Sequence, residues 1–253
     1  MHTAKFWFHS SFDGLLTANH KSGEFTYQFK GEPSVKHLVE AMRIPHTEVG
    51  KIFVNEREVN LSYLAQDGDS IAVYPVQDYR TYNSIVGENS KTSEARFILD
   101  NHLGKLATYL RMLGFDALYR NNYQDDELAE LASNDGRVLL TRDRGLLMRR
   151  TIEFGYFIRS MDAKRQLVEV LQQYELFHQV RPFERCLRCN ERLRRIEKIQ
   201  ILDRLEPLTQ KYYNEFSICS KCDKIFWKGS HYERMQGFIN NLKDQTLRST
   251  NNE

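Results

Sequence analysis

The chain contains four cysteines, arranged as two Cys-x-x-Cys pairs, Cys186–Cys189 and Cys219–Cys222, with 29 residues between the pairs. Each short pair presents two sulfur atoms to one metal ion, and four thiolates complete the tetrahedral shell of a structural Zn²⁺. No cysteine is left for a disulfide or a lone nucleophile. The alternative, two redox-active pairs, would require each pair to follow a strand and open a helix. The spacing therefore predicts a closed Cys₄ zinc site.

A second set of candidate residues is acidic. Asp100 and Asp143 each follow a short apolar run with the character of a strand, and Asp126 begins the helix after another. In a parallel α/β sheet, ligands bind at the carboxyl ends of the strands, so these three carboxylates are expected to converge. Crowded carboxylates repel one another unless a cation joins them, and oxygen ligands favour Mg²⁺ or Mn²⁺. Helix capping by Asp100 or Asp126 and a surface ion pair at Asp143 are the alternatives.

The elements that must position these acids alternate between strand and helix. Strands are expected at 96–100, 115–119, 138–141 and 156–159. A helix follows the first of them, with Leu103, Leu106, Ala107, Leu110 and Leu113 on one face, and Gly114 closes it. Further helices are expected from Asp125 and around 167–171. This alternation predicts a parallel sheet with right-handed crossovers.

The first 76 residues have a different pattern. Aromatic strands are expected at 5–8 and 25–29, followed by a helix that opens at Pro33-Ser34 and by strands at 52–55 and 71–74. This order is typical of a β-grasp fold. The phrase Asn55–Val59 and the turn Gln66–Asp69 resemble the sulfur carriers of thiamine and molybdopterin synthesis and a ubiquitin-like domain. Those carriers act through a terminal Gly-Gly, which this segment lacks, so an interaction or scaffolding role is expected instead.

Composition and charge limit the class of protein. The 253 residues carry a net charge of +2, with 41% hydrophobic and 28% charged residues, as in an ordinary soluble protein. No run of apolar residues is long enough for a membrane span, and no signal peptide is evident. With reduced cysteines, this predicts a cytoplasmic protein. Residues 1–77 hold 7 Lys/Arg against 9 Asp/Glu, whereas residues 78–253 hold 29 against 25, so a nucleic acid partner is expected on the C-terminal side.

Three motifs carry a family resemblance. The run from Phe97 to Phe115, the segment Asp125–Leu128 and the run from Leu139 to Leu147 resemble the Mut-seven C-terminal RNase domain, a member of the PIN-like superfamily. In that family a zinc ribbon follows the nuclease domain, and a ubiquitin-like domain often precedes it, so the resemblance covers about residues 3–235. It implies that Asp100, Asp126 and Asp143 hold a catalytic divalent metal, with Asp125 and Glu127 as further candidates. For a fourth acid, Asp162 is the nearest residue.

Basic residues near these acids are candidate RNA contacts. Lys105 and Arg111 lie on the helix after Asp100, and Arg142 and Arg144 flank Asp143, where a phosphate contact would fix the RNA backbone. Pairing with the acids themselves is the alternative. In the ribbon the candidates are Arg188 and Arg192.

Two further ribbon residues have open roles. Trp227 is expected to pack over the cysteines, with stacking on a base as the alternative, and His231 is a possible RNA or active-site contact. Residues Leu193, Ile196, Ile199, Ile201 and Leu202 are expected to supply the hairpin of the ribbon.

Together these observations predict an α/β protein of three parts. A ubiquitin-like β-grasp domain (1–77), a linker (78–94), a PIN-like domain with a parallel sheet (95–178), a Cys₄ zinc ribbon (179–236) and a polar tail (237–253) are expected. The expected function is a metal-dependent ribonuclease with structural Zn²⁺ and catalytic Mg²⁺ or Mn²⁺. The alternatives are a non-catalytic RNA-binding or ribosome-associated adaptor and a scaffold whose β-grasp domain binds a protein partner. The oligomeric state does not follow from the sequence.

Overall fold

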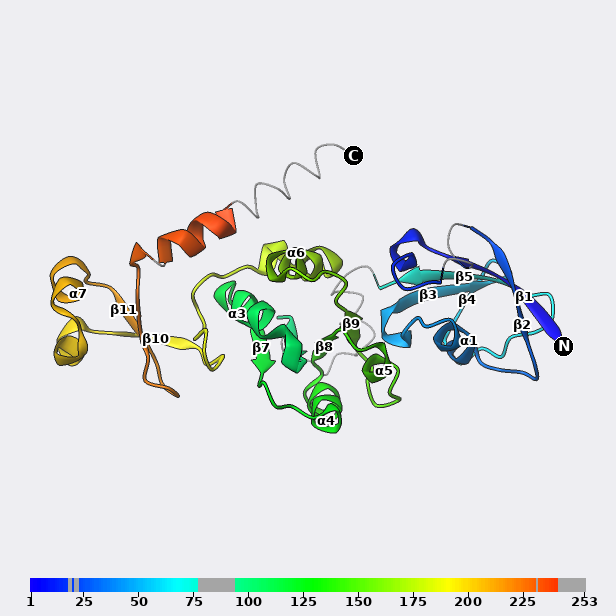
Figure 1. Cartoon of the computed structure of the whole chain (residues 1–253), viewed down its shortest axis with the longest axis horizontal. Coiled ribbons are helices and arrows are strands. Elements are labelled where there is room, and N and C mark those ends of the chain that lie inside the picture. The colour runs from blue at the N-terminus through cyan, green and yellow to red at the C-terminus, as the bar shows by residue number, and fades with distance from the viewer. Residues whose placement is uncertain (18–19, 21–22, 77–93, 231, 241–253) are drawn as a thin grey trace.

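The computed structural model describes residues 1–17, 20, 23–76, 94–230 and 232–240. Its three parts follow one another in chain order, with a sheet domain at one end, a central α/β domain and a small β-ribbon at the other end (Figure 1). Most of the expected linker (78–94), residues 241–253 of the expected tail, and His231 lie outside the described residues. In the described part of the chain, no helix is long and apolar enough to cross a membrane.

The N-terminal part is the expected β-grasp sheet. Its five strands are β1 (His2–Phe8), β2 (Phe25–Phe29), β3 (Val49–Val54), β4 (Arg57–Val59) and β5 (Ser70–Pro75), in the order β2-β1-β5-β3-β4. Only β1 and β5 pair in parallel; the other neighbours are antiparallel. Helix α1 (Val35–Ala41) begins after Ser34, whose hydroxyl accepts a hydrogen bond from the backbone of His37 and so caps the helix. The short 3₁₀ turns η1 (Ser10–Phe12) and η3 (His46–Glu48) complete the domain.

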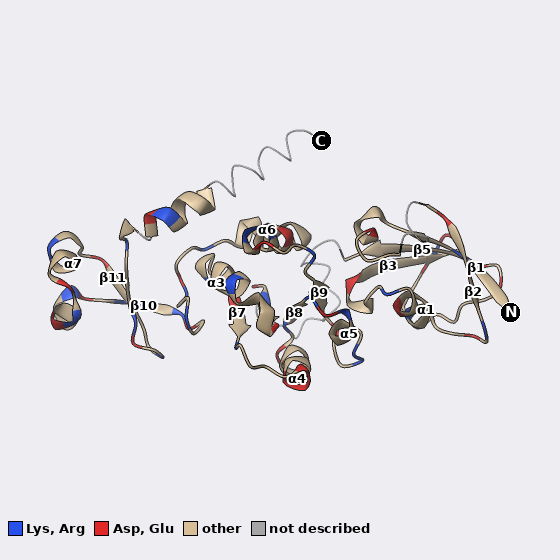
Figure 2. Ribbon diagram, in the orientation of Figure 1, with Lys and Arg blue, Asp and Glu red and all other residues tan. Residues whose placement is uncertain are grey.

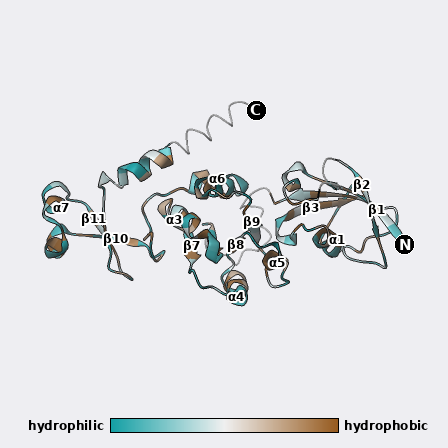
Figure 3. Ribbon diagram, in the orientation of Figure 1, coloured by the Kyte–Doolittle hydropathy of each residue, from teal (hydrophilic) through white to brown (hydrophobic). Residues whose placement is uncertain are grey.

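The central part is a three-layer α/β domain. Four parallel strands, β6 (Arg96–Leu99), β7 (Asp116–Tyr119), β8 (Val138–Thr141) and β9 (Gly155–Phe157), lie in the order β7-β6-β8-β9. Alternate residues of β6 and β8 face opposite layers, as the period of a strand requires. Phe97 and Leu99 pack with α3 (Gly104–Met112) and α6 (Ala163–Gln173), whereas Ile98 packs with α4 (Asp125–Asp135) and α5 (Arg144–Leu147). Helix α6 carries both apolar and polar residues (Figure 3), and its buried face includes Leu167, Val170 and Leu171.

The end of α3 shows why one glycine is required. Gly114 has φ +94°, a left-handed conformation that side chains with a Cβ rarely adopt. A Cβ at this position would also lie 2.2 Å from the carbonyl oxygen of Arg181. The returning chain runs this close because Arg181 and Phe183 donate backbone hydrogen bonds to Leu113 and Met112. The expected helix stop is confirmed, and it is also the point where the ribbon leaves the α/β domain.

The C-terminal part is a three-stranded antiparallel ribbon. Its strands are β10 (Leu193–Ile196), β11 (Phe216–Cys219) and β12 (Ile225–Trp227), with η6 (Lys198–Arg204) and α7 (Pro207–Tyr212) between the first two. The prediction that Ile199, Ile201 and Leu202 extend the hairpin is wrong, because these residues form the 3₁₀ helix η6. Residues 232–240 are helical and return to the central domain, where Ile239 is buried and Phe238 lies against Tyr109. This helix runs past residue 236, where the polar tail was expected to begin.

Side chains from the two flanking parts cover both edges of the central sheet. At edge strand β9, the carboxylate of Glu48 accepts hydrogen bonds from the backbone N–H of Phe157 (2.7 Å) and from the guanidinium of Arg159 (2.6 Å). At the opposite edge strand β7, the amide oxygen of Asn190 accepts a hydrogen bond from the backbone N–H of Ala117 (3.0 Å). Unpaired edge groups are a liability for any sheet, so both contacts stabilise the central domain.

Glu48 is the most buried acid of the first interface. Its side chain is 3% exposed, and burial raises its pKa even though Arg159 and the Phe157 amide favour the ionised form. Nearby, His46 contacts the carbonyl oxygen of Ile152 through Nε2 (2.8 Å) and Glu40 through Nδ1 (2.7 Å). The β-grasp domain is therefore docked on β9 by buried polar contacts.

We expect the substitution Glu48→Ala to destabilise the protein by about 2–3 kcal/mol, because it leaves the Phe157 N–H and the Arg159 guanidinium without their carboxylate partner. Urea unfolding monitored by circular dichroism measures this change. The exposed Glu32 in the same domain provides the control Glu32→Ala, for which we expect a change within about 0.5 kcal/mol. Equal stability of the two variants would contradict the assigned role of Glu48.

Candidate functional site

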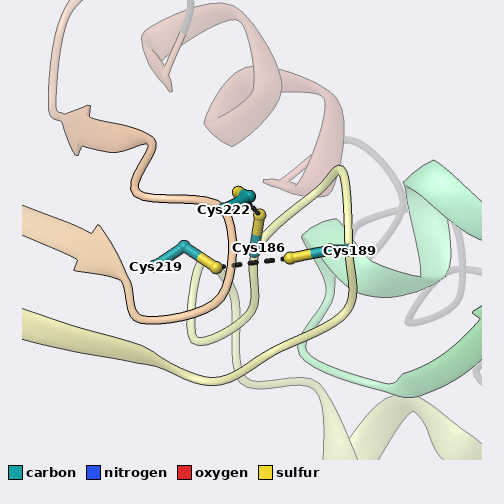
Figure 4. Close-up of side chains that lie close together, drawn as sticks. All are labelled: Cys186, Cys189, Cys219 and Cys222. Carbon is teal, nitrogen blue, oxygen red and sulfur yellow. Dashed lines mark hydrogen bonds between the residues drawn. The ribbon is translucent and has the colours of Figure 1, made fainter.

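The four cysteines lie together at the junction of the ribbon and the central domain. The sulfur atoms of Cys186 and Cys222 are 3.6 Å apart, those of Cys189 and Cys219 are 3.3 Å apart, and all four lie within 4.8 Å of one another (Figure 4). A tetrahedral zinc ion with Zn–S bonds of about 2.3 Å places its sulfur atoms about 3.8 Å apart, close to this spacing. The four cysteines therefore can hold a metal such as zinc, and they fill its coordination shell.

The two Cys-x-x-Cys turns have the same backbone design. The N–H of Cys186 donates to the carbonyl of Glu191, and the N–H of Asn190 donates back to the carbonyl of Cys186. In the second turn, Cys219 donates to Lys224, and Asp223 donates back to Cys219. Asn190 and Asp223, which directly follow the second cysteine of each pair, both have positive φ, 69° and 57°. This repeated geometry is what aims all four sulfur atoms at one point.

The first of these turns is also fixed to the central domain. The amide group of Asn190 donates to Asp116 (2.7 Å) as well as accepting from Ala117, and Arg137 donates to the same carboxylate (2.6 Å). These partners hold the pKa of Asp116 below its usual value, although burial opposes that shift. The buried guanidinium of Arg111 donates to the carbonyl oxygens of Ala117, Leu187 and Arg188. The zinc site and the edge of the central sheet therefore share one polar network.

Two of the three predicted catalytic acids are joined through a threonine. The hydroxyl of Thr141 donates to Asp100 Oδ2 (2.7 Å) and accepts from the backbone N–H of Asp143 (3.0 Å). Thr141 is fully buried at the end of β8, and Asp100 follows the neighbouring strand β6. Asp143 also caps α5 by accepting hydrogen bonds from Gly145 and Leu146 through Oδ1. The carboxyl ends of the neighbouring parallel strands β6 and β8 thus bring Asp100 and the backbone of Asp143 onto one threonine hydroxyl.

The third acid, Asp126, is turned toward an arginine. It lies in the first turn of α4, its side chain is 94% exposed, and it is paired with Arg149, which also lies 3.6 Å from Asp125. The acidic start of α4 stands out in Figure 2. The hydrogen bond to Asp126 is the largest cause that raises the pKa of Arg149, and the negative charge of Asp143 raises it further. Glu127 pairs instead with Arg120.

Arg149 is the residue that sequence reasoning missed. Lys105, Arg142 and Arg144, which lie nearer to the acids in the sequence or on the expected helix, were predicted as phosphate contacts, with pairing to the acids as the alternative. Arg149 stands beyond the short α5, where no motif or periodicity marks it. Its position follows from the turn after α5, which brings the chain back toward α4.

The predicted basic contacts have different surroundings. Lys105 is exposed on α3, and no ion pair of its side chain occurs within the described residues. Arg142 donates to the carbonyl of Ser160, and Arg144 donates to the carbonyls of Leu15 and Gly14 in the β-grasp domain. Arg111 is buried in the network around the zinc site. Arg188 and Arg192 are exposed on the ribbon, and Arg192 pairs with Glu94 (3.0 Å).

Two other expectations can be compared with the structure. Trp227 is 40% exposed and packs against Tyr213 and Phe216 with ring centroids 6.5 and 6.4 Å away, so it does not form a buried cover over the cysteines. Asp162 caps α6 through hydrogen bonds from Lys164 and Arg165. Like Asp143 at α5, it uses one carboxylate oxygen, Oδ1, as a helix cap.

The acidic residues fit a divalent metal by their chemistry. Mg²⁺ is commonly held by one or two carboxylates and keeps several waters, which matches the pair Asp100 and Asp143. Asn101, directly after Asp100, has a buried side-chain oxygen that finds no hydrogen-bond partner among the described residues, and such an atom in a native protein calls for a water or an ion. Within the described residues, the cysteines are the one group of three or more potential ligands whose atoms come within 4.8 Å of one another. Asp126 therefore does not share that close spacing with the other two acids.

We expect the purified protein to contain one zinc ion per chain, and the substitution Cys219→Ser to remove it, because a structural Zn²⁺ needs all four thiolates. The variant should also unfold at a lower temperature, since the first cysteine turn is bonded to β7 through Asn190. Metal analysis and thermal unfolding measure both effects. The neighbouring exposed Ser220 provides the control Ser220→Ala. Full zinc content in the Cys219→Ser variant would contradict a Cys₄ site.

Comparisons with known proteins agree with these parts. A family model described as the Mut7-C RNAse domain matches residues 95–239, and one described as the Mut7-C ubiquitin domain matches residues 1–80. A solved structure described as a putative molybdopterin converting factor, subunit 1, from Pyrococcus furiosus shares 21% identity, with a TM-score of 0.24, over 30% of this chain and 98% of that chain. A comparison with curated proteins finds no match. The nuclease-domain model spans the central sheet, the zinc ribbon and the returning helix, so this chain belongs to the Mut7-C RNAse domain family, with the ubiquitin-like domain of that family at its N-terminus.

Proposed function

We propose that the protein is a cytoplasmic, metal-dependent ribonuclease that hydrolyses phosphodiester bonds at the carboxyl ends of β6 and β8. The observation that carries this proposal is the link from the Asp100 carboxylate through the Thr141 hydroxyl to the backbone N–H of Asp143, which holds the two acidic residues at the edge where parallel sheets bind ligands. The family match supports RNA as the substrate. Thiols that remain reduced for a zinc site are typical of the cytosol.

Asp100 and Asp143 would hold Mg²⁺ or Mn²⁺, which supplies charge stabilisation to a phosphodiester and lowers the pKa of a water. Asp100 is oriented for this role because Thr141 and the Asn101 N–H fix both of its oxygens. Asp143 caps α5 through Oδ1, and its Oδ2 accepts no hydrogen bond within the described residues. That oxygen is therefore the one available for a metal.

The other charged residues divide into two groups. Lys105 is exposed on α3, the helix that follows Asp100, and can contact a phosphate of the substrate. Asp126 and Asp125 pair with Arg149, whose pKa is raised also by the charge of Asp143. Glu127 lies beside them on α4. If a metal on Asp100 and Asp143 also draws in Asp126, Arg149 loses part of its pairing and becomes available to a phosphate. The β-grasp domain, docked on β9, would bind a protein partner through its other faces.

The first test of catalysis is the substitution Asp143→Asn. Asparagine caps a helix about as well as aspartate, so the fold should persist while the charge is lost. We expect cleavage of single-stranded RNA with Mn²⁺ to fall by at least about 100-fold, because even an outer partner of a metal is worth about 10–100-fold in activity. The exposed Asp203 on η6 gives the control Asp203→Asn.

Two results would contradict this proposal. One is a parent protein that cleaves neither single-stranded nor structured RNA with Mn²⁺. The other is an Asp143→Asn variant with full activity. If RNA binding remains in either case and does not depend on Mg²⁺, the protein is an RNA-binding adaptor.

The second test concerns Arg149. Arg149 occupies Asp126, the third acid that the family resemblance implies as a ligand, and its positive charge also acts on Asp143. The substitution Arg149→Gln should therefore make Mn²⁺ bind about two- to five-fold more tightly, the range expected for removing an exposed ion pair. Electron paramagnetic resonance of free Mn²⁺ measures this affinity without any RNA. The adjacent exposed Arg150, changed to glutamine, is the matched control. Equal Mn²⁺ affinity of the two variants would show that Arg149 does not compete with the metal.

A further inference from the structure

A cavity of about 570 Å³ lies between the ribbon sheet and the helix at 232–240. This volume is within the range of about 300–1,000 Å³ that small-molecule sites have in proteins. Its apolar lining includes Leu187, Leu193, Phe226 and Met235. The cavity is far in the sequence from Asp100 and Asp143, and its lining contains neither them nor a zinc ligand.

Aromatic rings line two sides of this cavity. On the sheet side, Phe226 is paired directly with Ser217, which is paired in turn with Arg195, so these three residues share one face of the ribbon. Ile225 and Trp227 alternate to the other face, where Ile225 packs in the ribbon core, and parts of both residues also line the cavity. On the opposite side, Tyr232 of the returning helix packs against Phe183, with ring centroids 4.2 Å apart and the ring planes tilted by 36°.

Positive charge surrounds these rings. Lys224 lies over the ring of Phe226, 5.8 Å from its centroid, and Arg195 forms no ion pair within the described residues. The two acids of the lining are Glu197 and Glu215. Glu215 is already paired with Lys228 (2.8 Å). The hydrogen bond and positive charge of Lys228, and to a smaller extent the charge of Arg195, hold the pKa of Glu215 below its usual value.

The remaining cation of the lining is committed elsewhere. Arg185 donates to the carbonyls of Gly114 and Asn190 and lies 3.6 Å from Asp116. With Glu215 neutralised by Lys228, the free cations Arg195 and Lys224 face the single acid Glu197. The whole ribbon, residues 179–236, has the same bias, with 13 Lys/Arg and 8 Asp/Glu. This charge favours an anionic occupant over an apolar peptide side chain.

We propose that this cavity binds one unpaired nucleotide of an RNA strand, with its base on Phe226 and its phosphate at Arg195 and Lys224. The choice of RNA rests on the proposed ribonuclease function. Aromatic rings hold single-stranded RNA by stacking on bases of any identity, and neighbouring cations hold the phosphates. A base inside a duplex cannot enter such a cavity, so the site selects single-stranded segments and anchors them beside the nuclease domain.

The chain offers a reporter for this binding. It has two tryptophans, Trp7 in the β-grasp domain and Trp227 in the lining of the cavity. The substitution Trp7→Phe leaves Trp227 as the lone tryptophan, which can be excited selectively at 295 nm or longer wavelengths, and Asp143→Asn in the same chain prevents cleavage. Titration of this zinc-loaded protein with a 12-nucleotide single-stranded RNA, and with a duplex of the same sequence, gives two affinities. We expect the single strand to change the Trp227 fluorescence and to bind more tightly than the duplex.

The variant Phe226→Leu in this background tests the stacking. Leucine keeps the site apolar but cannot stack, so we expect single-stranded RNA to bind about 5- to 100-fold more weakly, the value of one stacked base. Phe226→Tyr should restore binding. Tyr212, an exposed aromatic residue on α7 outside the cavity, gives the control Tyr212→Leu. Arg195→Gln should reduce the slope of log affinity against log salt by about one.

Zinc content and thermal unfolding show whether each variant is folded. If the folded Phe226→Leu variant binds single-stranded RNA as tightly as the parent protein does, no base stacks in the cavity and the proposal is overturned. This holds whether the cavity binds a peptide or remains empty. Equal affinity for single strand and duplex overturns the proposal as well. Both of these results leave the nuclease proposal intact. The nuclease proposal fails if the parent protein does not cleave RNA, and in that case RNA binding that still depends on Phe226 would keep the cavity proposal.

Discussion

The structure depends on how the two edges of its central parallel sheet are satisfied. A four-stranded sheet leaves a row of backbone groups unpaired on each outer strand, and each buried group without a partner costs free energy. Here Glu48 of the β-grasp domain accepts the free N–H of β9, and Asn190 of the zinc ribbon accepts that of β7. The flanking domains are therefore part of the structural support of the nuclease domain.

This arrangement connects the cysteine cluster with the acidic residues. The four cysteines lie close enough together to bind a metal such as zinc, and their first turn carries Asn190 to the sheet. The carboxylates of Asp100 and Asp143, by contrast, are held at the carboxyl ends of β6 and β8. Because the sheet links these sites, loss of zinc should disturb the geometry of the acids even though no cysteine contacts them.

The docking of the β-grasp domain also changes the role of a residue beside the acids. Arg144 directly follows Asp143, and an RNA contact was expected there. Its guanidinium instead donates to the backbone carbonyls of Leu15 and Gly14. The β-grasp domain thus fixes the start of α5, which Asp143 caps. A scaffolding role within the chain, rather than only toward a partner, follows from this contact.

Local spacing and periodicity were enough to predict the clustering of the four cysteines, the β-grasp order, the parallel α/β sheet and the places of Asp100 and Asp143 at strand ends. The sequence by itself could not determine which partners the long charged side chains choose. Arg149 reaches Asp126, Arg111 is buried among carbonyls of the ribbon, and Arg144 crosses to another domain. Such choices depend on which backbones fold side by side, and only the tertiary structure brings those distant segments together.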